Sequence, residues 1–234
     1  MRAAGMKRVM IIAALSGELK PLVSGWQQRG KNLWAGRIGD HEAIAIAGGI
    51  GAAAAQRAVE RAFAEGNPGV LVSYGWAGAL TCAVKPPEAC VISEIVDAAS
   101  GEHFATASVD GFRLITLDRV ARYDEKRALA QKHQAVLVDM EAAAVARMAV
   151  ARRIPFYCFK GISDGYLDRL PDFSRFINDS GELRVPAFLS YVALRPNYWA
   201  SLRRLGVNSS AAASAVADLM KENLKQPLSR IAVD

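Results

Sequence analysis

The stretch VLVDMEAAAVARMAV, residues Val136–Val150, runs from an apolar strand into an apolar helix with two acids at the junction. Its residue pattern predicts a strand over Ala135–Val138 and a helix over Ala142–Ala151. Asp139 and Glu141 stand between these two elements. Removing an unpaired carboxylate from water is costly, so two acids with such apolar flanks indicate a role beyond packing.

The rest of the chain also alternates short apolar strands with helices. We expect strands within residues 9–14, 32–39, 41–49, 69–80, 89–99, 111–120 and 154–165, the fourth of which ends in a glycine-rich turn, GWAGAL. Helices are expected at about 52–63, at 125–133 with Asp124 as its cap, and at 209–224 with a cap near Ser209. This alternation predicts an α/β fold with a largely parallel central sheet.

Composition and charge limit the classes of protein to consider. The 234 residues, 52% of them hydrophobic, suffice for one large core, and no linker or repeat divides residues 1–234 into separate domains. The net charge of +6 is typical of a basic surface or of an anionic partner, such as nucleic acid or a membrane. No nucleic-acid recognition motif is present, so we expect no nucleic-acid partner.

The N-terminal segment MRAAGMKRVMIIAALSGELK is superficially similar to a secretion signal. Its apolar run, Val9–Leu15, is short, and Glu18 and Lys20 follow it without a cleavage site. We therefore expect a first buried strand here, with Met6 as an alternative start of the chain.

Cysteine usage favours a reducing compartment. The three cysteines, Cys82, Cys90 and Cys158, have neither the spacing of a zinc site nor that of a disulfide framework. No apolar run approaches the ~20 residues of a membrane span. We expect a cytoplasmic protein, with or without membrane association, that needs no metal or other cofactor.

Three acids and two glycine-rich turns follow apolar strands. Glu18, Glu141 and Asp164 each come just after a strand, and Gly48–Gly51 and Gly75–Leu80 follow two others. Ligands of α/β proteins bind where strands end, so these features are expected to meet in one site. Each also has a structural interpretation: Glu141 can complement its helix dipole, Asp164 can cap a turn, and glycines commonly serve turns.

Five segments together resemble a known family. IIAALSGELKPL, GGIG, YGWAGAL, VDMEAAAVA and FKGISDG follow the order and approximate spacing of the nucleoside phosphorylase/nucleosidase superfamily, with DMEAAA and ISDG the most specific. That superfamily includes purine nucleoside phosphorylases and methylthioadenosine/S-adenosylhomocysteine nucleosidases. The resemblance covers residues 8–170 and leaves a helical part, 171–234. It implies a single three-layer α/β/α domain around a twisted, barrel-like mixed sheet, in a homo-oligomer that is a dimer or larger.

The resemblance also implies cleavage of the bond between ribose and a purine, expected to be adenine. Asp164, held by Ser163, would protonate N7 of the base, so this acid must hold a proton when it acts. Glu141 would bind the ribose hydroxyls and Met140 would pack on the sugar. The sugar becomes oxocarbenium-like, so a fixed carboxylate there favours the transition state. Asp139 is interpreted as structural support.

Glu18 bears on whether water or phosphate is the acceptor. It matches a glutamate that orients a water in the nucleosidases, and the loop SYGWAGAL lacks an arginine typical of phosphorylases. A hydrolase is therefore favoured over a phosphorylase. Lys20 and Arg57 could each meet an anion, so the phosphate-dependent reaction stays an alternative.

The substrate pocket departs from the small-substrate nucleosidases. Trp76 stands where the family has a small residue, and Ala79 replaces a glycine, which argues against methylthioadenosine as the substrate. Val120 or Tyr123 would face the base. The expected substrate contacts, besides Met140 and Ser163, are Gly51, Gly75, Trp76, Ala77 and Val120.

The tail resembles a branch of the superfamily that is associated with hopanoid lipid synthesis. The similar elements are an apolar stretch ending in RP, then SLRRL and NSSAAASA. That branch removes adenine from adenosylhopane, so the resemblance implies a lipid-linked nucleoside and peripheral membrane contact. Tyrosine, tryptophan and arginine in FLSYVALRPNYWASLRRL suit a membrane interface. The alternative is ordinary packed core, because Pro196 interrupts the segment. A non-catalytic nucleoside-binding protein is a further alternative.

Overall fold

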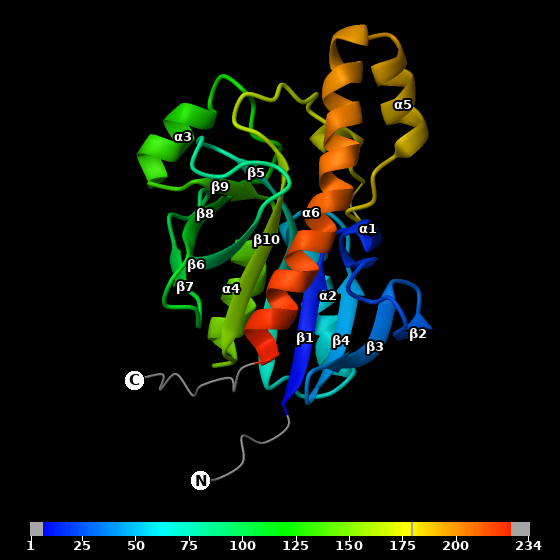
Figure 1. Cartoon of the computed structure of the whole chain (residues 1–234), viewed down its shortest axis with the longest axis vertical. Helices are drawn as coiled ribbons and strands as arrows, with labels where there is room; N and C mark the ends of the chain where they lie inside the picture. The colour runs from blue at the N-terminus through cyan, green and yellow to red at the C-terminus, as the bar shows by residue number, and fades with distance from the viewer. Residues whose placement is uncertain (1–6, 179, 226–234) are drawn as a thin grey trace.

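The computed structural model describes residues 7–178 and 180–225, in which ten strands join one sheet (Figure 1). The strands are β1 (Arg8–Ala13), β2 (Gln27–Gly30), β3 (Leu33–Ile38), β4 (His41–Ala47), β5 (Val70–Ala79), β6 (Ala89–Asp97), β7 (His103–Ala105), β8 (Phe112–Thr116), β9 (Leu137–Asp139) and β10 (Phe156–Asp164). The helices are α1 (Ser16–Leu19), α2 (Ala52–Ala64), α3 (Lys126–His133), α4 (Ala142–Ala151), α5 (Val185–Ala193) and α6 (Trp199–Lys225), with short 3-10 turns η1 (Ser174–Phe176) and η2 (Pro196–Tyr198). Met6, the alternative start, lies outside the described residues.

The sheet closes on itself over half its width. Its strand order is β10-β6-β8-β9-β5-β1-β4-β3-β2, with β7 paired antiparallel to β6 outside this order. Strand β10 also pairs with β5, so five strands form a closed ring. The pairs β1–β4, β1–β5, β5–β10, β6–β8 and β8–β9 are parallel, whereas β10–β6, β5–β9 and β2–β3–β4 are antiparallel. The expectation of a largely parallel sheet is therefore wrong, and the twisted, barrel-like mixed sheet is confirmed.

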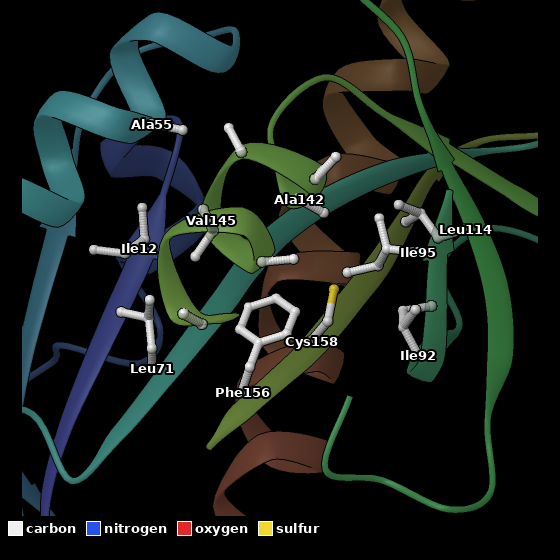
Figure 2. Packing of buried hydrophobic residues seen from close by; sticks show 14 of the residues in the cluster. Ile12, Ala55, Leu71, Ile92, Ile95, Leu114, Ala142, Val145, Phe156 and Cys158 are labelled. Carbon is white, nitrogen blue, oxygen red and sulfur yellow. The ribbon is translucent and has the colours of Figure 1, made fainter. Parts of the chain in front are cut away.

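Helices cover the sheet on both faces. α2 and α4 contact one another beside β1, β4 and β5, and the second half of α6 runs along β10 (Figure 1). Figure 2 shows part of the apolar cluster that includes Val145 of α4 and the strand residues Leu71, Ile95 and Phe156. These side chains are buried because α4 is alanine-rich and lets the helix approach the sheet closely.

The glycine-rich segment after residue 74 is strand rather than the expected turn. β5 continues through GWAGA and pairs with β10, Gly75 opposite Lys160 and Gly78 opposite Asp164. Gly75 has a φ of +144°, a conformation that side chains rarely adopt. The strand keeps its pairing with β10 through this glycine, and that pairing closes the ring.

Two of the expected helix caps are wrong, although the helix after the opening stretch has the predicted bounds, Ala142–Ala151. α3 begins after Glu125, not Asp124, and the Glu125 carboxylate accepts the backbone N–H of Arg122 instead of capping the helix. α6 begins at Trp199, ten residues before Ser209, which is a buried interior residue. The helix formers SLRRL carry the helix through Gly206.

The tail forms a helical projection at the cavity end of the sheet. α5, η2 and the first half of α6 extend beyond the strands (Figure 1). Val185, Leu189, Leu194 and Trp199 are 49–81% exposed here, and we name these four residues the tip patch. The packed-core interpretation of FLSYVALRPNYWASLRRL is wrong for the last three of them. Within residues 7–178 and 180–225, no helix has the length and apolar character needed to cross a membrane.

Candidate active site

A cavity of about 270 Å³ lies at one end of the strand ring and brings the three predicted acids together. Glu18, Glu141 and Asp164 all line it, although they follow β1, β9 and β10. The other predicted residues on its wall are Trp76, Ala77, Val120, Met140 and Ser163. Strand β5 connects the three strands: it runs parallel to β1 and β10 and antiparallel to β9, and its Gly78 lies opposite both Asp164 and Val138.

The two predicted glycines contact the acids rather than the cavity. Gly51 donates its N–H to Glu141, and a Cβ on Gly75 would collide with the Glu18 carboxylate. Of the two candidates to face the base, Val120 lines the cavity, whereas Tyr123 is 39% exposed and stacks with Arg169.

Glu18 is a buried carboxylate held by backbone amides. One oxygen, Oε2, accepts the N–H groups of Ala14 (2.8 Å) and Leu15 (2.7 Å), and Oε1 accepts that of Trp76 (2.7 Å). Burial raises the pKa of Glu18, and these hydrogen bonds oppose the rise. The side chain thus occupies a concave set of amides that would suit an anion, and it is poised to take a proton.

Glu141 faces the cavity from the N-terminus of α4 and does not cap that helix with its side chain. Its Oε1 accepts the N–H of Gly51 at 2.7 Å. Removal from water, followed by repulsion from Asp139, raises the pKa of Glu141 to about 8. Glu141 therefore holds its proton in the ligand-free protein near neutral pH.

Asp139 has the structural surroundings expected for a supporting residue. It accepts hydrogen bonds from Thr116 Oγ1 (2.7 Å) and the N–H of Ala142 (2.9 Å), so Asp139 rather than Glu141 caps α4. Its side chain is also fully buried against Lys160, whose Nζ lies 2.8 Å away. Burial acts to lower the pKa of Lys160, but the carboxylates around it, chiefly Asp139, raise it above its usual value.

Sequence reasoning missed Lys160 as a member of the site. The signal was a lysine inside the apolar strand FYCFKGI, where a charge needs a partner. Lys160 lies behind the cavity and offsets part of the negative charge of Asp139, Glu141 and Glu18.

Asp164 is bonded on both oxygens. Ser163 Oγ donates to Oδ1 at 2.9 Å, and Lys126 Nζ donates to Oδ2 at 2.7 Å. A Cβ on Gly78 would lie 2.9 Å from Oδ2, so the glycine leaves space for the carboxylate. The ion-pair partner, Lys126, was not expected.

Lys126 was missed because the sequence predicted a helix over 125–133 without assigning a contact to any of its side chains. It is the first residue of α3, where the helix dipole disfavours a cation, and this unfavourable position was the available signal. Only 3% of the residue is exposed, and its Nζ also donates to the carbonyl oxygen of Gly165 at 2.8 Å.

The cations proposed for an anion site lie elsewhere or are engaged. Arg57 lines a separate cavity of about 220 Å³, together with Arg61 and Glu182. Lys20 is exposed on the surface and is absent from the cavity wall. The cations on that wall are Lys126 and Arg119. Arg119 pairs with Glu125 through its two terminal nitrogens, Nη1 and Nη2.

One wall of the cavity is apolar and comes from the tail. Its side chains are Leu170, Phe173, Leu183, Phe188, Leu202 and Leu205. A backbone hydrogen bond joins the tail to the glycine-rich loop after β4: the N–H of Ile50 donates to the carbonyl oxygen of Gly181 at 2.8 Å. The helical part of the chain therefore completes the site.

Solved structures with the same fold include several nucleoside-cleaving enzymes. Helicobacter pylori 5′-methylthioadenosine/S-adenosylhomocysteine nucleosidase, in complex with an inhibitor, superposes with a TM-score of 0.70 and 15% identity over 94% of this chain and 98% of its own. Streptococcus pyogenes S-adenosylhomocysteine nucleosidase gives 0.70 and 18% over 95% and 98%. Futalosine hydrolase of Helicobacter pylori gives 0.68 and 15% over 94% and 97%.

These structures are 15–18% identical to the chain and therefore show that the fold is shared. Membership of a family is shown by a family model. No curated protein is similar enough in sequence to match the chain. The model of the phosphorylase superfamily matches residues 8–112 and 102–185, well over half of the 234 residues. This match includes the segments that carry Glu18, Glu141 and Asp164. The predicted family resemblance is confirmed, and the chain belongs to the phosphorylase superfamily as an enzyme with its fold.

Proposed function

We propose that this chain cleaves the N-glycosidic bond of an adenine nucleoside, with water as the acceptor. The observation that carries the proposal is the single cavity lined by Glu18, Glu141 and Asp164. Cleavage needs a proton for the leaving base, a negative group beside the developing sugar cation, and a base for the nucleophile. Asp164 supplies the proton, Glu141 is the negative group beside the sugar, and Glu18 is the base.

Each acid has surroundings that fit its part. Ser163 orients Asp164 toward the base, and Met140 lies beside Glu141 on the ribose side. The carboxylate of Glu141 accepts the ribose hydroxyls and gains strength as the sugar becomes positive, which lowers the barrier. Glu18, whose pKa is raised by burial, takes a proton from the attacking water.

Water is favoured over phosphate by the position of Glu18. Its carboxylate already occupies the backbone N–H groups of Ala14, Leu15 and Trp76, which are the donors that an anion would otherwise use. A phosphate dianion next to this carboxylate would be repelled. Phosphorolysis stays the alternative reaction, and nucleoside binding without turnover is the alternative from another class.

The apolar wall supports a substrate with a large apolar 5′ substituent. Nucleoside hydroxyls need polar partners, whereas Phe173, Phe188 and Leu202 offer none. The specific substrate that we propose is adenosylhopane, a lipid-linked nucleoside of hopanoid synthesis. Methylthioadenosine, which occupies the active site of a Helicobacter pylori nucleosidase variant with the same fold, is the smaller alternative.

A lipid-linked substrate also requires a route from the membrane, and the tip patch provides a candidate contact. Its apolar side chains are flanked by Arg184, Arg195 and Arg203, a combination that suits an anionic lipid surface. Trp199 is held in place by its indole N–H, which donates to the carbonyl oxygen of Val192 at 3.0 Å. The alternative is that the tip patch forms a contact between copies of the chain in the predicted homo-oligomer.

The proposal is tested by adenine release, followed by chromatography, from methylthioadenosine and from a 5′-dodecylthio analogue. Each reaction is run with and without phosphate. We expect release without phosphate and a higher kcat/KM for the long-chain substrate. Phe188→Ser should reduce that preference, and Leu189→Ser, its exposed neighbour on α5, is the matched control.

Other outcomes point to the alternatives. Release that requires phosphate would identify a phosphorylase. Equal or better cleavage of methylthioadenosine would keep the reaction and remove the lipid-linked substrate. Binding of both nucleosides without adenine release would favour the binding protein.

A further inference from the structure

We propose that Lys126 is the source of the proton that leaves with the base, and that it acts through Asp164. This inference rests on the proposed function, because it assigns the origin of a proton in that reaction. Lys126 is not among the acids and glycine-rich segments from which the sequence predicted the site.

The first support is the geometry of the Lys126–Asp164 pair. Lys126 Nζ lies 2.7 Å from Asp164 Oδ2, and the two side chains are only 4% and 10% exposed. Ser163 donates to the other oxygen of Asp164. Both oxygens of Asp164 thus accept hydrogen bonds from donors that bring their own protons, which is the arrangement of an ionised carboxylate.

The second support is that structural stability does not account for Lys126. A buried ion pair adds little net stability, and a cation in the first turn of a helix is unfavourable. A lysine side chain is long enough to reach solvent, as the exposed Lys132 does from the same helix. Lys126 instead turns inward and lines the cavity beside Asp164.

The third support is that the other cavity cation has a different partner. Arg119 pairs with Glu125 through Nη1 and Nη2, so the Glu125 carboxylate already balances its charge next to the site. Lys126 is thus the cation on the described cavity wall that contacts a proposed reacting acid.

Protons and electrons balance over the whole reaction. Lys126 passes a proton to Asp164, so that its ammonium becomes an amine. As the C1′–N9 bond breaks, its electron pair goes to the base, and Asp164 gives that proton to N7 and is again a carboxylate. Water bonds to C1′ and gives one proton to Glu18. Exchange with solvent then returns a proton to Lys126 and removes one from Glu18.

The test is Lys126→Arg, because arginine keeps the charge and the hydrogen bonds but does not release its proton in proteins. The substrates are the 5′-dodecylthio adenosine and 4-nitrophenyl β-D-ribofuranoside, whose nitrophenolate departs without being protonated. We expect K126R to lose about 10²- to 10⁴-fold in kcat on the nucleoside, the range of general acid catalysis, and far less on the nitrophenyl riboside. Lys132→Arg on the same helix is the matched control.

A second variant guards against a loss of fold. If thermal unfolding shows that K126R is destabilised, Lys126→Gln, which is smaller and uncharged, is measured in its place and should show the same difference between the two substrates. Asp164→Asn should give the same pattern as either variant, since it removes the group through which Lys126 acts.

The remaining outcomes separate this inference from the proposed function. Wild-type turnover of the nucleoside by K126R would overturn the inference and leave the proposed reaction intact. An equal loss on both substrates would also overturn it, because Lys126 would then only shape the site. A wild-type protein that cleaves neither substrate would overturn the proposed function and this inference with it.

Discussion

Glu18, Asp139 and Glu141 are three carboxylates around one site, and their surroundings make them different. Amides surround Glu18, and Lys160 neutralises Asp139. Glu141 accepts the backbone N–H groups of Gly51 and Met140, but burial and repulsion from Asp139 raise its pKa to about 8. Neighbouring acids that have different hydrogen-bond partners and charges around them can each take a different part in one reaction.

Glu141 gives a prediction on the pH dependence of catalysis. The substrate requires its carboxylate form, which dominates only above a pH of about 8 in the free protein. We expect kcat/KM to rise with pH up to about 8, and Glu141→Gln to remove that rise and lower kcat/KM by about 10²- to 10³-fold. Initial rates between pH 6 and 9 measure both effects.

The exposed Glu88→Gln is the control for Glu141→Gln and should keep the wild-type profile. A wild-type kcat/KM that is flat across this range would contradict the assigned ionisation of Glu141.

At the scale of elements, the contact between α6 and β10 depends on a missing side chain. A Cβ on Gly161 of β10 would lie 2.5 Å from the carbonyl oxygen of Ala212 in α6. We expect Gly161→Ala to lower the free energy of unfolding by about 1–3 kcal/mol, because the helix must move away from the strand. Urea denaturation measures the change.

Gly206 is the matched control for Gly161, because it lies in α6 with open space around a Cβ. Gly206→Ala should stabilise the protein by about 0.5–1 kcal/mol through helix propensity. Equal effects of the two substitutions would show that close packing of α6 on β10 is unimportant.

The tip patch gives a second prediction at this scale. Leu194, which follows the end of α5, is 81% exposed, and Trp199, the first residue of α6, is 55% exposed. Leu194→Glu and Trp199→Glu should weaken cosedimentation with vesicles that contain anionic phosphatidylserine, because a buried charge opposes insertion. Val150→Glu, on the 61% exposed Val150 of α4, should leave sedimentation unchanged.

Two results would decide against a membrane role for the tip patch. Wild-type protein that stays in the supernatant at low ionic strength has no such contact. If Leu194→Glu instead reduces the mass of the particle in solution, the patch belongs to a contact between copies of the chain.

The whole molecule places the cavity between a closed strand ring and a helical tail. Ring strands β5, β9 and β10 come from distant parts of the sequence (Figure 1). The tail adds the apolar wall of the cavity. Acids in such a site are kept from water by the fold as a whole, so their ionisation is linked to global stability.

That linkage predicts how stability depends on pH. The raised pKa of Glu141 means that the folded protein keeps a proton that the unfolded chain loses above about 4.5. Its contribution to stability is therefore full below that pH and is lost as the pH rises through about 8. We expect the free energy of unfolding to fall between pH 6 and 9, by at most about 1.4 kcal/mol per pH unit for this one proton.

Glu141→Gln should flatten that decline, and the difference between the two proteins isolates Glu141 from other titrating groups. Urea unfolding at several pH values provides the measurement. Identical pH slopes for the two proteins would mean that Glu141 ionises alike in the folded and unfolded chains.

Much of the fold and of the site was predictable from the sequence. The helix Ala142–Ala151, the hairpin of β3 and β4, and the strand-end positions of Glu18, Glu141 and Asp164 follow from local patterns. Apolar periodicity and acids next to buried strands are properties of short segments, and short segments are what a sequence specifies directly.

Only the tertiary structure decided how those segments meet. The closure of β5 on β10 made GWAGA a strand, because its hydrogen bonds go to residues far away in the sequence, with Gly75 opposite Lys160. The same closure buried Lys160 against Asp139, and the loop before α3 brought Lys126 to Asp164. The interaction between two charges depends on their distance in space and not on their separation along the chain. The sequence alone therefore predicted the acids of the site, whereas only the fold showed that Lys160 pairs with Asp139 and Lys126 with Asp164.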